Sequence, residues 1–402
     1  MSSAATSPAL AADPEARAAQ LVARAAALGP RILERAREAE AQGRLTDDVF
    51  AALLETGVFR ALTPKRWGGL GLGVRCLCDL ARALARFDAS AAWVTAFLVE
   101  HNWMICRMGL AAQQELFGSG RGYVIASAPL APGGSAVRVP GGFRAQGRWR
   151  YASGVAHAEW TLVCCTVAEG GGAVPWMFLV PVREVTVLDE WHVSGMCATS
   201  STNLTAKDLF VPEARALELA RFYSAADHPG AAHEESIYRY PILPGLLAML
   251  AAIALGSAEG ALELARARLS ETAPWGVKRI DRAASRARWA AAHQDVRCAA
   301  LLYEALLANV IATGEQARAL ELAEDGQLAL DVATVTHLAK GAIASLVDGC
   351  GSGVFSLDDP IQRFHRDVTV MASHLANDWD VVTERGARYV LGVGRAPGDP
   401  VL

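Results

Sequence analysis

Two histidines lie in apolar stretches of sequence, where an imidazole is unusual unless it has a specific partner. His374 lies among Val370, Met371 and Leu375, and His101 ends a long apolar run in the sequence VEHNW. Because the ordinary pKa of histidine is about 6.5, either ring could take up or release a proton at neutral pH. A single histidine on an apolar helix is nevertheless more often a structural group. Residue type alone therefore leaves a catalytic and a structural interpretation open.

Common catalytic motifs are absent from the sequence. It has no GxGxxG after a strand, no phosphate-binding loop ending in GK[ST], no HExxH and no GxSxG. The eight cysteines form no CxxC pair, and no group of Cys and His has zinc-ligand spacing. These absences argue against a Rossmann nicotinamide site, a nucleoside-triphosphate site, a zinc protease and an α/β-hydrolase. If the protein catalyses a redox reaction, its cofactor must be held in some other way.

Composition narrows the class of protein further. The chain has 402 residues, of which 52% are hydrophobic and 20% charged, so it can bury a large core. A net charge of −4 argues against a general nucleic-acid or anionic-membrane surface. The Ser/Ala/Pro-rich residues 1–13 do not resemble a signal peptide, because no basic segment precedes an apolar one. We expect a cytoplasmic protein whose cysteines are free thiols and which binds no metal.

The first and last parts of the chain predict helices. Ala/Leu/Arg/Glu periodicity predicts one amphipathic helix over Asp13–Ala41. Further N-terminal helices are predicted over Thr46–Leu54 (ended by Gly57), Cys76–Phe87 and Ala89–Met108, with a glycine-rich connection at Pro64–Gly73. The helical pattern returns from Ile242 and is broken at Pro274 and at Gly349–Pro360.

Between Arg239 and Glu259, nineteen residues carry no charge, which is long enough to span a bilayer. Prolines and a glycine at the start of this segment favour a loop followed by a fully buried bundle helix.

The middle of the chain predicts a β module of roughly a hundred residues. From Phe143 to Tyr151, apolar and small residues alternate with basic or polar ones, which is typical of a half-buried strand. Other predicted strands are Gly122–Ser127, Ala136–Val139, Trp160–Val167, Trp176–Val180, Val185–Trp191 and Leu204–Phe210. Pro/Gly clusters at Ala131–Gly134 and Pro140–Gly142 predict turns between strands.

Four passages, taken in their order along the chain, resemble the acyl-CoA dehydrogenase family. They are Gly57–Leu72, Gly141–Trp160, Leu188–Pro212 and Pro360–His374. The resemblance extends from about Asp13 to Gly392. It implies an α+β fold that is mostly α: an N-terminal helical domain (residues 1–120), a central antiparallel β domain facing the flavin (121–228) and a C-terminal four-helix bundle (229–402).

Within that family, the details resemble the flavin-dependent monooxygenases that act as oxygenase components, such as phenol and steroid-ring hydroxylases. A dehydrogenase needs a positioned carboxylate to remove a proton from its thioester substrate. Leu375 stands where many dehydrogenases carry that glutamate, and no carboxylate lies between Pro244 and Ala258. The resemblance therefore implies an oxygenase.

The resemblance also implies roles for individual residues. His374 would be the base or would orient the substrate, and His101 would help to orient it. Ser153 would lie beside flavin N5 and stabilise the flavin hydroperoxide, and Ser127 would line the same pocket. Trp149 would flank the flavin, although an alternating strand position is more often core.

Arg268 would hold the flavin phosphate, from a neighbouring subunit, because a guanidinium suits a phosphate. Arg266 is two residues away and could take that role instead, and a solvated helix charge is the alternative for either.

The implied cofactor is reduced flavin, FMNH2 or FADH2, which reacts with O2 as co-substrate to form a C4a-hydroperoxyflavin. A separate NAD(P)H:flavin reductase would supply it, since no nicotinamide site is present. The implied assembly is a homotetramer that binds neither nucleic acid nor a membrane. The implied reaction is hydroxylation of a small or polycyclic, aromatic or phenolic substrate. Three alternatives stay open at this point: an acyl-CoA dehydrogenase with a displaced base, an N-oxygenating nitrososynthase-type enzyme, and a non-catalytic relative.

Overall fold

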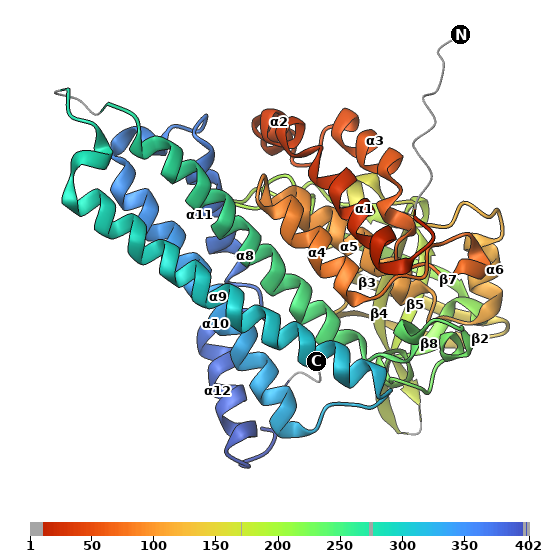
Figure 1. The fold of residues 1–402 in the computed structure, drawn as a ribbon. Coiled ribbons are helices and arrows are strands. Elements are labelled where there is room, and N and C mark those ends of the chain that lie inside the picture. Colours follow the sequence, from red (N-terminus) through yellow and green to blue (C-terminus); the bar gives the residue numbers. More distant parts are fainter. Residues whose placement is uncertain (1–10, 170, 273–275, 397–398, 400–402) are drawn as a thin grey trace, which may run out of the picture.

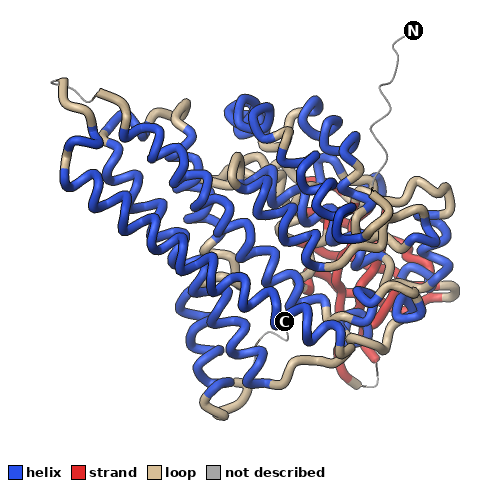
Figure 2. The backbone as a smooth tube through the Cα atoms, viewed as in Figure 1, coloured by secondary structure: helices blue, strands red, loops and turns tan. Residues whose placement is uncertain are grey.

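The architecture is α+β and mostly α, as the sequence predicts. The computed structural model describes residues 11–169, 171–272, 276–396 and 399. Long helices cross one side of the molecule, and the strands gather at the other end, beside the N-terminal helices (Figures 1 and 2). The predicted domain boundaries, at residues 120/121 and 228/229, fall between the last N-terminal helix and the first strand and ahead of the first long helix.

Six α-helices form the N-terminal block over the described residues 11–120. They are α1 (Pro14–Ala26), α2 (Gly29–Gln42), α3 (Asp47–Thr56), α4 (Val74–Ala85), α5 (Ala89–Ile105) and α6 (Leu110–Phe117). The single helix predicted over Asp13–Ala41 is wrong, because α1 and α2 are separate. Pro30 lies in the first turn of α2, where its missing N–H costs nothing. Inside one continuous helix, its ring would clash with the carbonyl of Ala26.

One mixed sheet of eight strands makes up the middle of the chain, in the order β6-β7-β3-β2-β4-β5-β8, with β1 on β4. The strands are β1 (Ala126–Ser127), β2 (Pro132–Val139), β3 (Gly142–Trp149), β4 (Trp160–Glu169), β5 (Gly172–Pro181), β6 (Thr186–Val187), β7 (Leu204–Pro212) and β8 (Ala216–Glu218). Most pairs are antiparallel as predicted, but β1 and β2 both run parallel to β4. This parallel pairing was not predicted, because it depends on a crossover rather than on local sequence.

The predicted turn at Ala131–Gly134 is wrong, since Pro132, Gly133 and Gly134 belong to β2. The two glycines are required there because β3 and its Trp149 indole lie close against the strand. A Cβ atom on Gly133 or Gly134 would lie 2.5 Å from the carbonyl oxygen of Arg148 or Gln146 and 2.8 or 2.9 Å from atoms of the indole. The glycines therefore mark a close approach of the neighbouring strand, not a chain reversal.

Helices return after the short α7 (Leu219–Tyr223). They are α8 (Ile242–Leu269), α9 (Ala283–Glu315), α10 (Leu322–Cys350), α11 (Pro360–Met371) and α12 (Trp379–Val390). The break predicted at Gly349–Pro360 is confirmed, and the one at Pro274 lies outside the described residues. Three long and two short helices thus occupy the region for which four bundle helices were predicted.

Three of these helices, α8, α9 and α10, are long and apolar enough by length and composition to cross a membrane. In α8, which contains most of the uncharged segment, 89% of the most apolar window is buried within the protein. This burial fits the predicted bundle helix, since an all-round apolar helix needs contacts on every side. The corresponding buried shares in α9 and α10 are 39% and 50%.

Close contact between α4 and α8 joins the two helical blocks into one hydrophobic core. The contact depends on glycines of α8: a Cβ atom on Gly256 would lie 2.2 Å from the carbonyl oxygen of Arg82, and one on Gly260 would lie 2.1 Å from that of Arg86. The backbones of α4 and α8 can approach this closely only because both positions lack side chains.

We predict that Gly256→Ala lowers the free energy of unfolding by about 1–3 kcal/mol, because the new methyl group overpacks the α4–α8 contact. The matched control is Gly341→Ala in α10, where a Cβ atom would meet nothing within 4 Å. That variant should gain roughly 0.5–1 kcal/mol from the better helix propensity of alanine. Urea unfolding followed by circular dichroism measures both. Equal effects of the two variants would contradict the packing argument.

Candidate active site

One face of α5 carries a row of rings. Trp93, Phe97 and His101 are spaced four residues apart, so they project from the same side of the helix. Their centroids lie 4.7 Å apart for the first pair and 5.6 Å apart for the second. All three are buried, so the row forms a continuous apolar wall that ends in an imidazole.

Two further predicted residues contact this wall at Trp93. The His374 ring, just after α11, meets the Trp93 ring edge-on with the centroids 5.7 Å apart. Ser153, in the loop after β3, accepts a hydrogen bond of 3.0 Å from Trp93 Nε1. The structure thus brings His101, His374 and Ser153 together through Trp93 and Phe97. These two aromatics were not predicted from the sequence, although their four-residue spacing with His101 is visible in it.

The ring of His101 is a neutral hydrogen-bond acceptor. Its Nδ1 lies 2.6 Å from the carbonyl oxygen of Ala126 in β1, and a carbonyl only accepts, so Nδ1 carries the hydrogen. Nε2 then offers a lone pair, and it is buried with no partner among the described residues. Burial also lowers the pKa of His101 to about 4. At neutral pH this ring can accept a hydrogen bond but is a weak base.

His374 presents the opposite pattern. Its Nδ1 accepts a 3.2 Å hydrogen bond from the backbone N–H of Ala376, so in the neutral ring Nε2 carries the hydrogen. The residue is exposed to solvent, yet desolvation by the surrounding protein lowers its pKa. This geometry favours His374 as a donor, whereas the predicted base would need a vacant nitrogen. The assignment of the base therefore stays a prediction.

Ser127 lies in β1, next to the residue whose carbonyl orients His101. It is fully buried, and its hydroxyl donates to Thr161 Oγ1 at 2.9 Å. Ser127 thus belongs to the same corner of the sheet as the His101 contact. Its hydroxyl hydrogen is already taken up by Thr161, which leaves an oxygen lone pair as its free polar feature.

Trp149 is not placed with these residues. It is fully buried in a separate core within the sheet and donates to the carbonyl of Cys164 at 2.7 Å. The aromatic beside Ser153 is instead Tyr151, which is 62% exposed and has a left-handed φ of 66°. Flavin contact by Trp149 stays a prediction, but Tyr151 is the ring that has surface to offer. The alternating pattern placed Tyr151 on the buried side of the strand, but β3 ends at Trp149, so the pattern does not apply to it.

Arg268, at the end of α8, also stands apart from the histidines. Its guanidinium pairs with Asp359, which caps the start of α11, and lies 3.9 Å from Glu271. Binding of a flavin phosphate from a neighbouring subunit by Arg268 stays a prediction. It would require the guanidinium to contact the phosphate and Asp359 at the same time.

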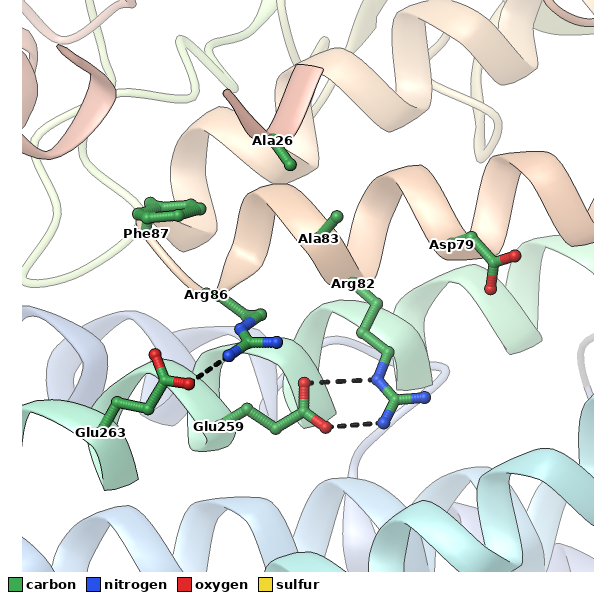
Figure 3. A pocket seen from close by; sticks show the side chains of 8 residues that line it. All are labelled: Ala26, Asp79, Arg82, Ala83, Arg86, Phe87, Glu259 and Glu263. Carbon is green, nitrogen blue, oxygen red and sulfur yellow. Dashed lines mark hydrogen bonds and ion pairs between the residues drawn. The ribbon is translucent and has the colours of Figure 1, made fainter. Parts of the chain in front are cut away.

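A surface hollow of about 340 Å³ lies elsewhere, between α1, α4 and α8 (Figure 3). Its charged side chains already pair with one another or with neighbours. Arg82 bonds Glu259 at 2.6 Å, and Arg86 bonds Glu263. Because these charges are balanced internally, the hollow offers no unsatisfied group to a ligand, unlike the α5 wall.

The residues along the α5 wall fit a flavin and an aromatic substrate. The Ser153 hydroxyl is half-buried, the Tyr151 ring is exposed, and the buried Nε2 of His101 lacks a partner. Within the described residues, no group of three or more His, Cys, Asp or Glu could hold a metal.

Comparison with known proteins decides the family. The model for the acyl-CoA dehydrogenase N-terminal domain matches residues 14–118, and that for the C-terminal domain matches residues 248–379. The chain is 31% identical over 389 residues to the flavin-dependent monooxygenase, oxygenase subunit HsaA, of Mycobacterium tuberculosis, covering 93% of this chain and 95% of the relative.

The chain belongs to the acyl-CoA dehydrogenase family, in its flavin-dependent monooxygenase branch.

Two further relatives agree with this assignment. The chain is 27% identical to an FADH2-dependent resorcinol hydroxylase, oxygenase component, of Rhizobium sp., over 93% of this chain and 94% of the relative. It superposes on XiaF of Streptomyces sp., solved in complex with FADH2 and glycerol, with a TM-score of 0.87 and 28% identity, over 96% and 98% of the two chains. The predicted recognition, fold and oxygenase activity with reduced flavin and O2 are confirmed, and the alternatives are not favoured. This monooxygenase therefore works with a separate flavin reductase.

Glu100, beside His101 on α5, makes the stability of this monooxygenase depend on pH. Both of its carboxyl oxygens are buried without a partner among the described residues, and burial raises its pKa from 4.5 to about 8. The folded protein therefore takes up a proton that the unfolded chain lacks at pH 7. This contribution to stability is complete below the unfolded pKa and is lost as the pH rises through about 8.

We predict that Glu100→Gln, which cannot ionise, becomes more stable relative to the parent protein as the pH rises from 5 to 9. The difference in unfolding free energy should change by on the order of a few kcal/mol in favour of the variant. The exposed residue Glu55 provides the control variant Glu55→Gln. Chemical unfolding at a series of pH values measures the effect, and parallel pH curves for the parent and Glu100→Gln would contradict it.

Proposed function

We propose that this monooxygenase hydroxylates a small or polycyclic phenolic substrate on the α5 wall, using FMNH2 or FADH2. The observation that carries the proposal is a complementary pair of imidazoles on one aromatic wall: a buried acceptor at His101 Nε2 and a donor at His374 Nε2. A phenol needs both kinds of partner, because its hydroxyl donates one hydrogen and its oxygen accepts. The name of the resorcinol hydroxylase points to the same substrate class.

The chain's own residues divide the work. His101 accepts the phenolic hydrogen and fixes the orientation of the ring, while His374 donates to the oxygen and stabilises negative charge there. Trp93 and Phe97 exclude water from the buried His101, which strengthens its hydrogen bond. The cofactor, when bound, supplies the electrons that activate O2.

Ser153 and Tyr151 are the residues that would hold the flavin ring. Ser127 would line the pocket behind it, and an arginine such as Arg268 would reach the phosphate of a flavin in a neighbouring subunit. Hydroxylation at carbon is favoured over oxidation of an amine, because the relative from Rhizobium sp. is named as a resorcinol hydroxylase.

We also infer a homotetramer in the cytoplasm. Large apolar side chains are exposed on the C-terminal helices and their connections, and their burial would stabilise an assembly. They include Leu301, Phe355, Leu391 and Val393, which are 65%, 64%, 77% and 70% exposed. All eight cysteines are free thiols, which suits a reducing compartment. Sedimentation of the intact protein should give four times the mass of one chain, and a monomer would contradict this inference.

The proposed function predicts tight anaerobic binding of FMNH2 or FADH2 and oxygen-dependent hydroxylation of simple phenols. His374→Ala should lower hydroxylation roughly 100-fold, which is within the range for loss of one donor that stabilises developing negative charge. Electrons from the reduced flavin should then be recovered as hydrogen peroxide, because the substrate oxygen is no longer held.

The measurements are flavin titration, product analysis and peroxide assay. His337→Ala is the matched control, because that histidine of α10 packs against Trp379 of α12, and the variant should behave like the parent enzyme. Failure to bind either reduced flavin, or oxidation of amines without any phenol hydroxylation, would overturn the proposal.

A further inference from the structure

A chain of hydrogen bonds runs from the α5 wall into the loop between β6 and β7. Trp93 Nε1 donates to Ser153 Oγ at 3.0 Å, and Ser153 Oγ lies 2.8 Å from Ser201 Oγ. Ser201 Oγ lies 2.7 Å from Thr199 Oγ1, which lies 2.8 Å from the carbonyl oxygen of Met196. Thr199 and Ser201 are buried, so water does not compete for these bonds.

The two ends of this hydrogen-bond chain, a donor at Trp93 and a carbonyl acceptor at Met196, fix the direction of every hydrogen bond within it. A hydroxyl has one hydrogen to donate, and a carbonyl has none. Thr199 must therefore donate to the carbonyl of Met196, since two lone-pair oxygens would otherwise face each other at 2.8 Å. Ser201 must then donate to Thr199, and Ser153 must donate to Ser201.

The result is that the Ser153 hydroxyl has no hydrogen left for a ligand. Its hydrogen goes to Ser201, and one of its two lone pairs accepts from Trp93. One lone pair stays available, and Ser153 is only half-buried. Toward a bound molecule, this serine is an acceptor of an N–H or O–H group and not a donor.

The far end of the chain is anchored to the helix that leads to His374. The backbone N–H of Met196, a residue with a left-handed φ of 57°, donates to Asp367 Oδ1 in α11 at 2.6 Å. Trp191 Nε1 also donates to the Met196 carbonyl, at 3.1 Å. Because hydrogen bonds hold both the N–H and the carbonyl of Met196, the carbonyl that sets the direction of the hydrogen-bond chain is fixed in orientation.

We propose that Ser201 and Thr199 are positioning residues that hold Ser153 as a hydrogen-bond acceptor and so make the site select reduced flavin over oxidised flavin. Reduced flavin carries a hydrogen on N5 and can donate it to Ser153. Oxidised flavin has a lone pair at N5 and needs a donor, which Ser153 does not supply. This inference rests on the proposed function, in which Ser153 contacts the flavin.

The test is the ratio of dissociation constants for oxidised and reduced FMN and FAD, measured anaerobically without substrate or turnover. The parent protein should prefer the reduced forms. In Ser201→Ala the Ser153 hydroxyl no longer donates to Ser201 and can donate to N5 of oxidised flavin. The dissociation constant of oxidised flavin divided by that of reduced flavin should therefore fall about tenfold, the effect of one hydrogen bond. Ser200→Ala is the matched control, because that neighbouring hydroxyl contacts Ala156 N–H and lies outside the chain.

A second pair of variants keeps the test informative if Ser201→Ala does not fold. Thr199→Val removes the acceptor of Ser201 and should also lower the ratio, whereas Thr199→Ser retains the hydroxyl and should keep the parental ratio. A purely structural role would not distinguish oxidised from reduced flavin. If the parent prefers reduced flavin and Ser201→Ala and Thr199→Val match Ser200→Ala, the positioning role is overturned. If the parent binds no reduced flavin, the proposed function fails with it.

Discussion

The arrangement of the whole molecule depends on the complete burial of α5. Every residue of this helix is buried, so its polar side chains must find partners inside the protein. Three of them reach the β domain: Trp93 bonds Ser153, His101 bonds the carbonyl of Ala126, and Asn102 Oδ1 accepts from Val124 N–H at 2.7 Å. These bonds fix the sheet against the helices. The helix that carries the aromatic wall is therefore also the helix that positions the residues opposite it.

A group of buried charges holds the remaining side of the site. Glu40 of α2 accepts hydrogen bonds from Arg363 and Arg366 of α11, at 3.3 and 2.6 Å. Asp88 caps the start of α5 beside them. Burial together with the charge of Asp88 raises the pKa of Asp367. Replacing buried ion pairs by apolar residues often stabilises a protein, so we infer that these groups serve to fix the position of α11 rather than to add stability. They set α11, and hence His374, at a defined distance from α5.

The features that the sequence predicted are those with a local or periodic cause. The helices over Cys76–Phe87 and Ala89–Met108 and the half-buried strand Phe143–Tyr151 follow from apolar periodicity, and the structure has them within a few residues. The break before Pro30 was missed because the apolar spacing continues through it. The parallel pairing of β2 with β4 and the exposure of Tyr151 depend on contacts between distant segments, which no local pattern encodes. Thr199 and Ser201 were missed for a related reason, since a run of small polar residues is typical of an ordinary turn.

The two histidines show most directly what sequence cannot supply. The resemblance selected both, with His374 as the base or orienting group and His101 as a helper, but it could not show which ring donates and which accepts, because that difference lies in backbone atoms. A carbonyl oxygen, that of Ala126, holds the hydrogen of His101 on Nδ1 and leaves Nε2 as an acceptor. A backbone N–H, that of Ala376, occupies Nδ1 of His374 and leaves Nε2 as a donor. Identical side chains thus present opposite hydrogen-bonding groups, and the character of Ser153 is likewise set by a carbonyl three hydrogen bonds away. In this site, backbone atoms of the β domain and of the segment after α11 determine the direction in which each side chain's hydrogen points.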